Sequence, residues 1–210
     1  MYIDYTILIL FFLATIVRLV SLIISVTNER KLKKGNVVEY GVKNSKLLVL
    51  CHTFFYLCSI AEASVLRKNI GSISFIGLGL FIFSMIMLWI VILSLKEMWT
   101  VKLIIAPGQK INKSFIFKYF RHPNYFLNII PELVSISLIC QAWYTLCIGL
   151  PLYLIPLTIR INQEEKVMKK HFNNYWYESV SLKKEECRIL CWFLLCRIPK
   201  KFNPSKRLLL

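Results

Sequence analysis

The chain has 210 residues, of which 57% are hydrophobic and 18% charged. Soluble domains carry about 45–50% apolar and about 25% charged residues, so this balance excludes an ordinary soluble domain. The net charge of +16 does not indicate nucleic-acid binding, because Lys and Arg gather in loops beside apolar runs. Charges placed there set membrane orientation and attract anionic head groups, so we expect membrane lipids and no nucleic acid as partners.

The first apolar run, residues 5–27, predicts a membrane helix that stays in the mature protein. It is too long for the apolar part of a signal peptide and lacks a small-residue cleavage site. Arg18 lies inside this run. Two interpretations of Arg18 stand: its side chain snorkels toward the nearer membrane surface, or it is an intramembrane cation that faces the other helices.

Two further apolar runs, residues 47–66 and 73–95, predict the second and third membrane helices. The second run contains two polar side chains, His52 and Glu62, within apolar sequence. Short basic segments connect the runs, as expected for a compact bundle.

The last two spans are expected to form a helical hairpin. The fourth span begins at Tyr125, the chain turns near Gln141, and the fifth span ends around Ile161. Three prolines interrupt this segment: Pro131, Pro151 and Pro156. Each removes a backbone donor and kinks the helix, which is tolerated where the freed groups face protein or a cavity. The predicted fold class is an all-α integral membrane protein with about five transmembrane helices and a C-terminal helical hairpin.

Positive charge in the loops predicts the orientation. Residues 28–46 and 96–124 each hold six Lys or Arg, whereas 67–72 holds two and the turn at 140–144 holds none. Because cytoplasmic loops carry the excess of Lys and Arg, five spans place the N-terminus outside and the C-terminus in the cytoplasm.

We divide the chain into a polytopic membrane domain, residues 1–182, and a basic interfacial tail, residues 183–210. Residues 187–198 are expected to lie on the membrane as a short amphipathic helix. The cysteines of this helix, which are candidates for acylation, are Cys187, Cys191 and Cys196. Seven cysteines without a CxxC pair and only three histidines predict neither a disulfide framework nor a metal site.

Two polar clusters, one at each end of the hairpin segment, should meet at the same membrane face. Arg160 and Glu164 are four residues apart and share a helix face, and Tyr125 and Glu132, seven apart, share another. Glu132 lies in apolar sequence, where a buried carboxylate needs a cationic or hydroxyl partner. Arg160 on the neighbouring helix is the expected partner of Glu132.

These residues resemble the isoprenylcysteine carboxyl methyltransferase family and its phospholipid-methyltransferase relatives. The resemblance rests on Arg-His-Pro-Asn-Tyr at 121–125, then Glu132, then Arg160 with Glu164 and Glu165. The N-terminal half is similar to the bacterial branch of that family at Asn28-Glu29-Arg30, Glu39-Tyr40-Gly41, His52 and Trp99-Thr100.

The resemblance implies methyl transfer from S-adenosylmethionine at a cytoplasmic cofactor site. The cofactor contacts that it implies are His122, Pro123, Tyr125, Glu132, Glu164 and Glu165. It places Arg160 near an acidic group of the substrate, and the catalytic candidates are Arg160, Glu132 and His122. The general base stays open between His122 and a glutamate. The expected acceptor is a lipophilic small molecule, either a prenylcysteine carboxylate or, as for enzymes similar to the bacterial branch, a phenolic or pyrone lipid.

Two alternatives remain. A non-enzymatic polytopic protein, such as a small transporter or scaffold, would bind no cofactor and would line a path open to both faces with its charges. The polar residues of this chain concentrate on one face, which favours the enzyme. A phospholipid N-methyltransferase would share the cofactor but would methylate a lipid amine.

Overall fold

The computed structural model describes residues 4–35, 37–105, 116–117, 120 and 122–171. Arg121 lies outside the described residues. So does the tail from residue 172 onward, with the predicted interfacial helix at 187–198 and its cysteines.

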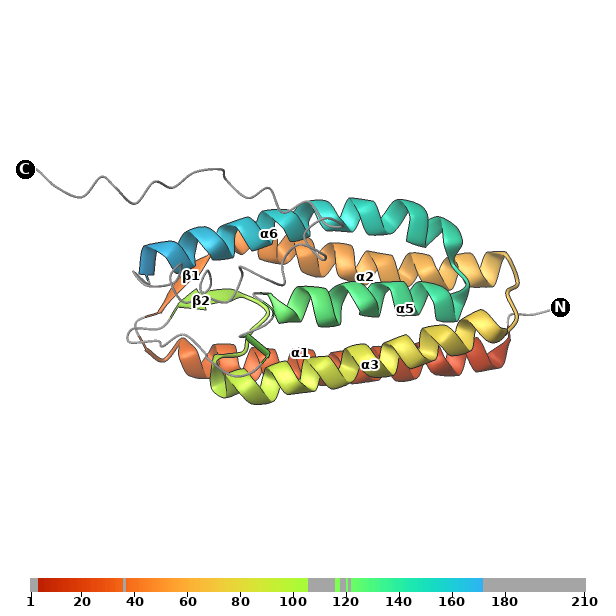
Figure 1. Cartoon of the computed structure of the whole chain (residues 1–210), viewed down its shortest axis with the longest axis horizontal. Helices are drawn as coiled ribbons and strands as arrows, with labels where there is room; N and C mark the ends of the chain where they lie inside the picture. Colours follow the sequence, from red (N-terminus) through yellow and green to blue (C-terminus); the bar gives the residue numbers. More distant parts are fainter. Residues whose placement is uncertain (1–3, 36, 106–115, 118–119, 121, 172–210) are drawn as a thin grey trace, which may run out of the picture.

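Within the described residues, five helices run side by side along one axis (Figure 1). They are α1 (Tyr5–Leu32), α2 (Val42–Val65), α3 (Ser72–Leu95), α5 (Ile130–Cys140) and α6 (Leu150–His171). Four helices are long and apolar enough to cross a membrane, and a shorter apolar helix covers Asn124–Ile139. The predicted helical membrane fold with about five spans is thus confirmed.

The helices extend beyond the apolar runs that predict them. The first is expected to end at residue 27 and the last around 161, but α1 continues to Leu32 and α6 continues to His171. Hydropathy marks where a helix leaves the apolar layer, whereas the backbone hydrogen-bond ladder continues wherever side chains support it. Arg160, Glu164 and Glu165, the polar residues at the end of the hairpin, therefore lie within helix α6.

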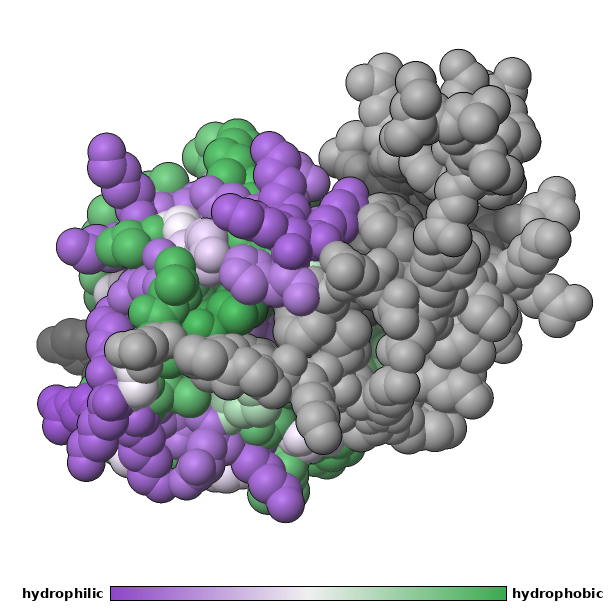
Figure 2. Space-filling model, turned by 90° about the vertical axis from the view of Figure 1, so that its left-hand side faces the viewer, coloured by the Kyte–Doolittle hydropathy of each residue, from purple (hydrophilic) through white to green (hydrophobic). Residues whose placement is uncertain are grey.

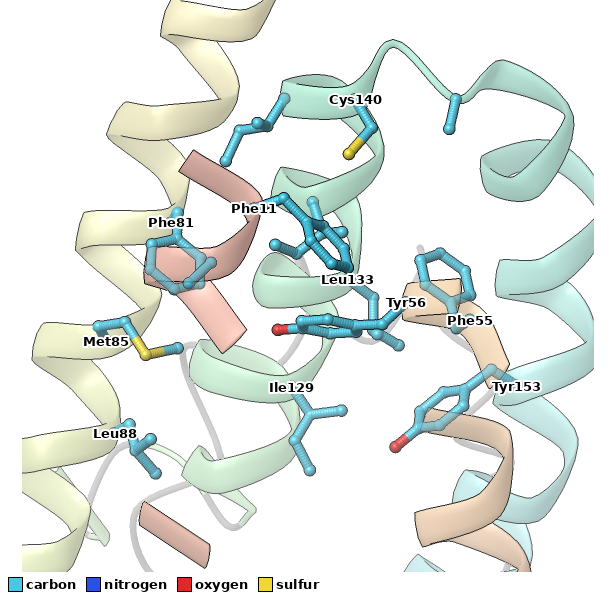
Figure 3. Close-up of a cluster of buried hydrophobic side chains, with 14 of the residues drawn as sticks. Phe11, Phe55, Tyr56, Phe81, Met85, Leu88, Ile129, Leu133, Cys140 and Tyr153 are labelled. Carbon is cyan, nitrogen blue, oxygen red and sulfur yellow. The ribbon is translucent and has the colours of Figure 1, made fainter. Parts of the chain in front are cut away.

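α5 is the central helix, because α1, α2 and α3 all pack against it. Gly77 of α3 allows the closest approach: a Cβ there would lie 2.7 Å from the backbone nitrogen of Ile139 and 2.9 Å from the carbonyl oxygen of Ser135. Small residues let membrane helices approach closely, where packing rather than the hydrophobic effect drives association. In the core that results, Phe11, Tyr56 and Leu133 gather from α1, α2 and α5 (Figure 3).

Two π-helical turns, η2 (Asn124–Ile129) and η3 (Thr145–Gly149), lead into α5 and α6. Pro131 follows η2 and Pro151 follows η3. A helical proline lacks the N–H donor, and its ring clashes with the carbonyl four residues earlier. A wider turn relieves that clash, and the N–H of Ile130 accordingly donates to the Tyr125 carbonyl, five residues back. Two of the three hairpin prolines, Pro131 and Pro151, therefore follow π turns, whereas Pro156 lies inside α6.

A two-stranded sheet covers one end of the bundle. β1 (Val38–Tyr40) and β2 (Leu103–Ile105) pair antiparallel, with Glu39 opposite Ile104. They lie where α2 begins and α6 ends (Figure 1). Seen from this end, hydrophilic side chains surround a few apolar ones (Figure 2). The sequence does not predict the sheet, because three residues are too few to show an alternating pattern. We call this the strand end of the bundle.

The opposite end is closed by capping interactions. The Glu62 carboxylate accepts hydrogen bonds from the backbone N–H of Tyr144 at 3.0 Å and of Thr145 at 2.7 Å, and from the Thr145 hydroxyl at 2.8 Å. These satisfy donors at the start of the helix that continues into α6. Gln141, with φ of 50°, forms the predicted turn. The polar Glu62 of the second span therefore has a structural role.

Candidate functional site

At the strand end, Arg160 binds groups from four segments of the chain and is 2% exposed. Its Nε donates to Glu164 Oε1 at 3.2 Å and to the Tyr125 hydroxyl at 3.3 Å. Its Nη1 donates to Ser45 Oγ at 2.6 Å, and its Nη2 donates to the Val101 carbonyl at 2.9 Å. All three guanidinium nitrogens thus have protein partners, so the side chain is fixed in one position.

His122 joins the same group of residues. Its Nδ1 lies 3.4 Å from Glu164 Oε2, and its Nε2 lies 3.6 Å from Glu165 Oε1. Its ring stacks on that of Tyr125 with centroids 5.9 Å apart, and the Tyr125 hydroxyl donates to Glu164 Oε1. The fully buried Pro123 precedes η2 and begins this turn. We call the set Ser45, His122, Tyr125, Arg160, Glu164 and Glu165 the end cluster.

The two carboxylates of the end cluster are its most exposed members. The side chains of Glu164 and Glu165 are 21% and 25% exposed, whereas those of His122 and Arg160 are 9% and 3% exposed. Lys169, on the surface of α6, approaches Glu165 at 4.0 Å. A ligand that arrives at the strand end would therefore meet carboxylate oxygens first, and the buried Arg160 holds one of them in place.

A second group of polar side chains lies deeper in the bundle, around Glu132, which is 0% exposed. Its Oε1 accepts a hydrogen bond from the Tyr56 hydroxyl at 2.7 Å. The same oxygen lies 3.3 Å from Arg18 Nε and 3.4 Å from His52 Nε2. The Tyr153 hydroxyl lies 3.4 Å from His52 Nδ1. We call Arg18, His52, Tyr56, Glu132 and Tyr153 the inner cluster.

The inner cluster corrects the expected pairing of Glu132 with Arg160. The cation beside Glu132 is Arg18 of α1, and Arg160 pairs with Glu164 on its own helix. Residue spacing shows which side chains share a face of one helix, but it does not show which neighbouring helix supplies the partner. The structure also decides between the two interpretations of Arg18, because its guanidinium points to a carboxylate within the bundle.

The two clusters lie in parallel layers, because each of four helical segments carries polar residues seven positions apart; the outer layer also contains Ser25, which lies outside the end cluster. The pairs are Ser25 and Arg18 in α1, Ser45 and His52 in α2, Tyr125 and Glu132 in η2 and α5, and Arg160 and Tyr153 in α6. Seven residues of helix rise about 10 Å. The inner cluster therefore lies about two helical turns below the end cluster. The backbone of Val101 completes the outer layer, since its N–H donates to Ser25 Oγ at 2.8 Å and its carbonyl accepts from Arg160.

Three buried atoms of the inner cluster lack a hydrogen-bond partner among the described residues. They are Glu132 Oε2, Arg18 Nη1 and His52 Nε2. Buried polar atoms are nearly always hydrogen-bonded in folded proteins, so the unpaired atoms indicate positions where a further polar group can bind.

The loops beside the end cluster are fixed by a tight turn and by ion pairs. Gly41, with φ of 64°, begins α2 beside the side chain of Gln163. Lys102 Nζ lies 2.5 Å from Glu29 Oε1 and thereby ties the segment before β2 to α1. Lys33 also pairs with Glu29, at 2.6 Å, and this hydrogen bond raises the pKa of Lys33 above its ordinary value. The loop that carries Val101 is therefore anchored by ion pairs.

Sequence reasoning identified part of this arrangement. The structure brings together His122, Tyr125, Arg160, Glu164 and Glu165, whereas it places Glu132 in the inner cluster. Their functional roles stay predictions. Arg18 and His52 could be identified from the sequence, because they are polar residues within apolar runs. Tyr56 could not be identified from the sequence, because tyrosine is common in apolar helices. Val101 could not be identified either, because it acts through its backbone. Among the described residues, no group of three or more His, Cys, Asp or Glu side chains could hold a metal ion.

Comparisons with known proteins agree with the sequence motifs. Residues 77–170 match the model of the isoprenylcysteine carboxyl methyltransferase (ICMT) family. An uncharacterized protein of Haemophilus influenzae is 51% identical over 156 residues, which are 74% of this chain and 91% of that protein. The uncharacterized protein YpbQ of Bacillus subtilis is 30% identical over 145 residues, which are 69% of this chain and 85% of YpbQ. No solved structure matches the chain.

Proposed function

Because the chain belongs to the isoprenylcysteine carboxyl methyltransferase family, we propose that it is a membrane O-methyltransferase that uses S-adenosylmethionine and acts on a lipid-like acceptor. Family membership implies methyltransferase activity, and the four long apolar helices agree with a membrane protein. The cofactor, the acceptor and the roles of individual residues are the proposed part. We also propose that the strand end faces the cytoplasm, because the basic segments that flank the spans lie there.

The residues of the end cluster fit the proposed cofactor by their chemistry. S-adenosylmethionine carries a sulfonium, an ammonium and ribose hydroxyls, for all of which carboxylates are suitable partners. Two carboxylates, Glu164 and Glu165, are partly exposed there, against one buried guanidinium, that of Arg160. Glu164 and Glu165 would hold the cofactor. His122, Tyr125 and Arg160 would hold Glu164 in its orientation.

Methyl transfer then requires little from the protein beyond correct positioning of the two reactants. When bound, the cofactor supplies a methyl group on a sulfonium, and the transfer is an in-line displacement. Such a step gains most of its rate from orientation and from exclusion of water. The protein contributes by fixing Glu164 through three side chains, those of His122, Tyr125 and Arg160.

One observation carries this proposal. Side chains from two segments more than thirty residues apart, His122 and Tyr125 before α5 and Arg160 and Glu164 within α6, meet in one hydrogen-bonded group at a single end of the bundle. A transporter would instead need charges along a path to the other end, where the carboxylates of Asp4 and Glu62 cap the starts of helices.

Isothermal calorimetry with S-adenosylmethionine, on the full chain in detergent, tests the proposal. The wild type is expected to bind, and His122→Ala and Glu164→Ala are expected to lose the binding heat. Glu97→Gln is the matched control, because Glu97 is a carboxylate 69% exposed in a surface pair with Lys31. Binding by both cluster variants as tight as that of the wild type would contradict the site. A wild type that binds no cofactor would contradict the function.

A further inference from the structure

Three motifs noted in the sequence lie outside both clusters. They are Asn28-Glu29-Arg30, Glu39-Tyr40-Gly41 and Trp99-Thr100. The first ends α1, the second contains the end of β1, and the third belongs to residues 96–102, which join α3 to β2 and which we call the connecting segment. The structure brings all three motifs to the strand end, so their contacts there indicate what they do.

Two buried side chains of α1 bind the backbone of the connecting segment. Asn28 Nδ2 donates to the carbonyls of Lys96 and Trp99, both at 3.0 Å. Ser25 Oγ, about one helical turn away on the same face, accepts from the Val101 N–H at 2.8 Å. Asn28 and Ser25 are 7% and 3% exposed. Because a buried backbone group is costly to leave unpaired, these two side chains fix the path of the backbone.

Ion pairs fix the other end of the connecting segment. Lys102 Nζ lies 2.5 Å from Glu29 Oε1 and 3.8 Å from Glu39 Oε1, so it joins α1 to β1. Lys33 Nζ lies 2.6 Å from Glu29 Oε1 and 3.2 Å from Glu39 Oε2. Two carboxylates and two ammonium groups thus alternate around a closed ring. A single exposed ion pair contributes little, whereas several charges that form a network hold a position.

Val101 connects the anchored segment to the end cluster. Its carbonyl accepts from Arg160 Nη2 at 2.9 Å, and Arg160 Nε donates to Glu164 at 3.2 Å. The Val101 carbonyl and the Lys102 N–H belong to one planar peptide unit, so the position of Lys102 sets the direction of the carbonyl. The preceding peptide unit is held by Ser25, which accepts from the Val101 N–H. Both peptide units that flank Val101 are therefore restrained from α1.

We infer that four residues outside the end cluster are positioning residues of the cofactor site. They are Ser25, Asn28, Glu29 and Lys102. They act on the Val101 carbonyl, through it on Arg160, and through Arg160 on the carboxylate of Glu164. This inference rests on the proposed function, since it takes S-adenosylmethionine as the ligand of Glu164.

Apolar packing of β2 is the competing explanation for the position of the connecting segment. Leu103 and Ile105 of β2 pack with Val167 of α6, and the sheet lies between the ends of α6 and α1 (Figure 1). This packing holds the chain after Lys102 and does not depend on charge. Removal of the Lys102 charge alone therefore separates the two explanations.

Hydrogen exchange without cofactor, on the full chain in detergent, gives the first test. Lys102→Met keeps the apolar stem of the side chain, and loss of its ion pairs is expected to make the Val101 amide exchange about fivefold faster. Lys31→Met is the matched control, because Lys31 also joins α1 to the connecting segment, at Glu97, but through an exposed pair. Equal exchange of the Val101 amide in Lys102→Met and the wild type would overturn the inference.

Calorimetric binding of S-adenosylmethionine gives the second test. Lys102→Met and Ser25→Ala are each expected to raise the dissociation constant about tenfold, the value of one hydrogen bond to a charged group. Lys102→Arg keeps the charge and should restore most of the affinity. Ser21→Ala is the control for Ser25→Ala, because Ser21 is also buried but its hydroxyl donates within α1, to the Arg18 carbonyl. Binding as tight as that of the wild type in both test variants would overturn the inference.

The background Arg160→Lys tests whether the effect passes through Arg160. A lysine keeps the positive charge but lacks the planar fork that reaches Glu164 and the Val101 carbonyl together. In this background, Lys102→Met is expected to weaken cofactor binding by less than about twofold, because residues that act as one unit are not additive. A further tenfold loss would overturn the route through Arg160.

The two kinds of measurement distinguish failure of this inference from failure of the proposed function. A wild type that binds S-adenosylmethionine, with Lys102→Met and Ser25→Ala binding equally well, would overturn the inference and spare the function. A wild type that binds no S-adenosylmethionine would remove the function and, with it, the role of these residues in cofactor binding. Exchange of the Val101 amide needs no cofactor, so it decides in either case whether α1 holds the connecting segment.

Discussion

The end cluster and the inner cluster share α2, α6 and the segment of η2 and α5, yet they satisfy charge differently. In the end cluster, one buried Arg160 is shared between Glu164 and Tyr125, and the acids reach the surface. In the inner cluster, a fully buried Glu132 gathers Arg18, His52 and Tyr56 around a single oxygen. Depth explains the difference, since water can hydrogen-bond to a carboxylate at the strand end but not to one inside the bundle.

A repeat of seven residues gives the bundle two polar layers at different depths. A spacing of seven places a polar side chain on the same helix face two turns further in. Each helix thus contributes to both layers with no change in its packing. The outer layer has partly exposed carboxylates, whereas the carboxylate of the inner layer is fully buried.

The largest expected effect comes from removing the cation of the inner cluster. Arg18→Ala leaves Glu132 buried without a charged partner and is expected to lower the free energy of unfolding by about 3 kcal/mol or more. Thermal unfolding in detergent measures the loss. A melting temperature equal to that of the wild type would show that burial does not make Glu132 dependent on its cation.

A pair of glycine variants separates both clusters from their scaffold. Gly77→Ala brings a Cβ against the backbone of α5 and is expected to destabilise by about 2 kcal/mol, as overpacking does. Gly79→Ala meets nothing within 4 Å and should be neutral or slightly stabilising. Because α5 carries Glu132 and continues from Tyr125, Gly77→Ala should also weaken cofactor binding, whereas Gly79→Ala should leave it unchanged. Unchanged cofactor binding by the Gly77 variant would contradict a shared scaffold.

Matched tyrosine variants compare the layers directly, since each removes one hydroxyl that donates to a carboxylate. Tyr56→Phe is expected to cost about 2 kcal/mol, because Glu132 has no water to replace the donor. Tyr125→Phe should cost about 1 kcal/mol or less, because Glu164 is partly exposed. The same unfolding measurement checks both, and equal costs would contradict the role that we give to depth.

The smallest effect is expected beside the end cluster, at Gly41. Its φ of 64° favours glycine, and Gly41→Ala should cost about 1 kcal/mol. The added methyl group would also displace the side chain of Gln163. The double variant Gly41→Ala/Gln163→Ala should recover part of the loss in melting temperature. No recovery would show that backbone strain alone accounts for the effect.

The sequence predicts the helical membrane fold well, because twenty-residue apolar runs and proline positions are strong local signals. It also predicts that Tyr125, Arg160 and Glu164 lie at one end, since a helical hairpin brings its two ends together. The partner of Glu132 could not be predicted, because the other four helices can be arranged around α5 in several ways and only their packing brings Arg18 next to it. The sheet and the role of Val101 depend on backbone groups, which side-chain patterns do not reveal.

The π turn at Asn124–Ile129 also has a consequence for how the two layers stay aligned. A π turn can be regarded as an α-helix with one residue inserted, and each residue of an α-helix advances about 100° around the axis. Deleting one residue from this turn would therefore swing Tyr125 and His122 by about a quarter of a revolution relative to Glu132. The inserted residue acts as an angular spacer, so insertions and deletions here would be tolerated far less than substitutions.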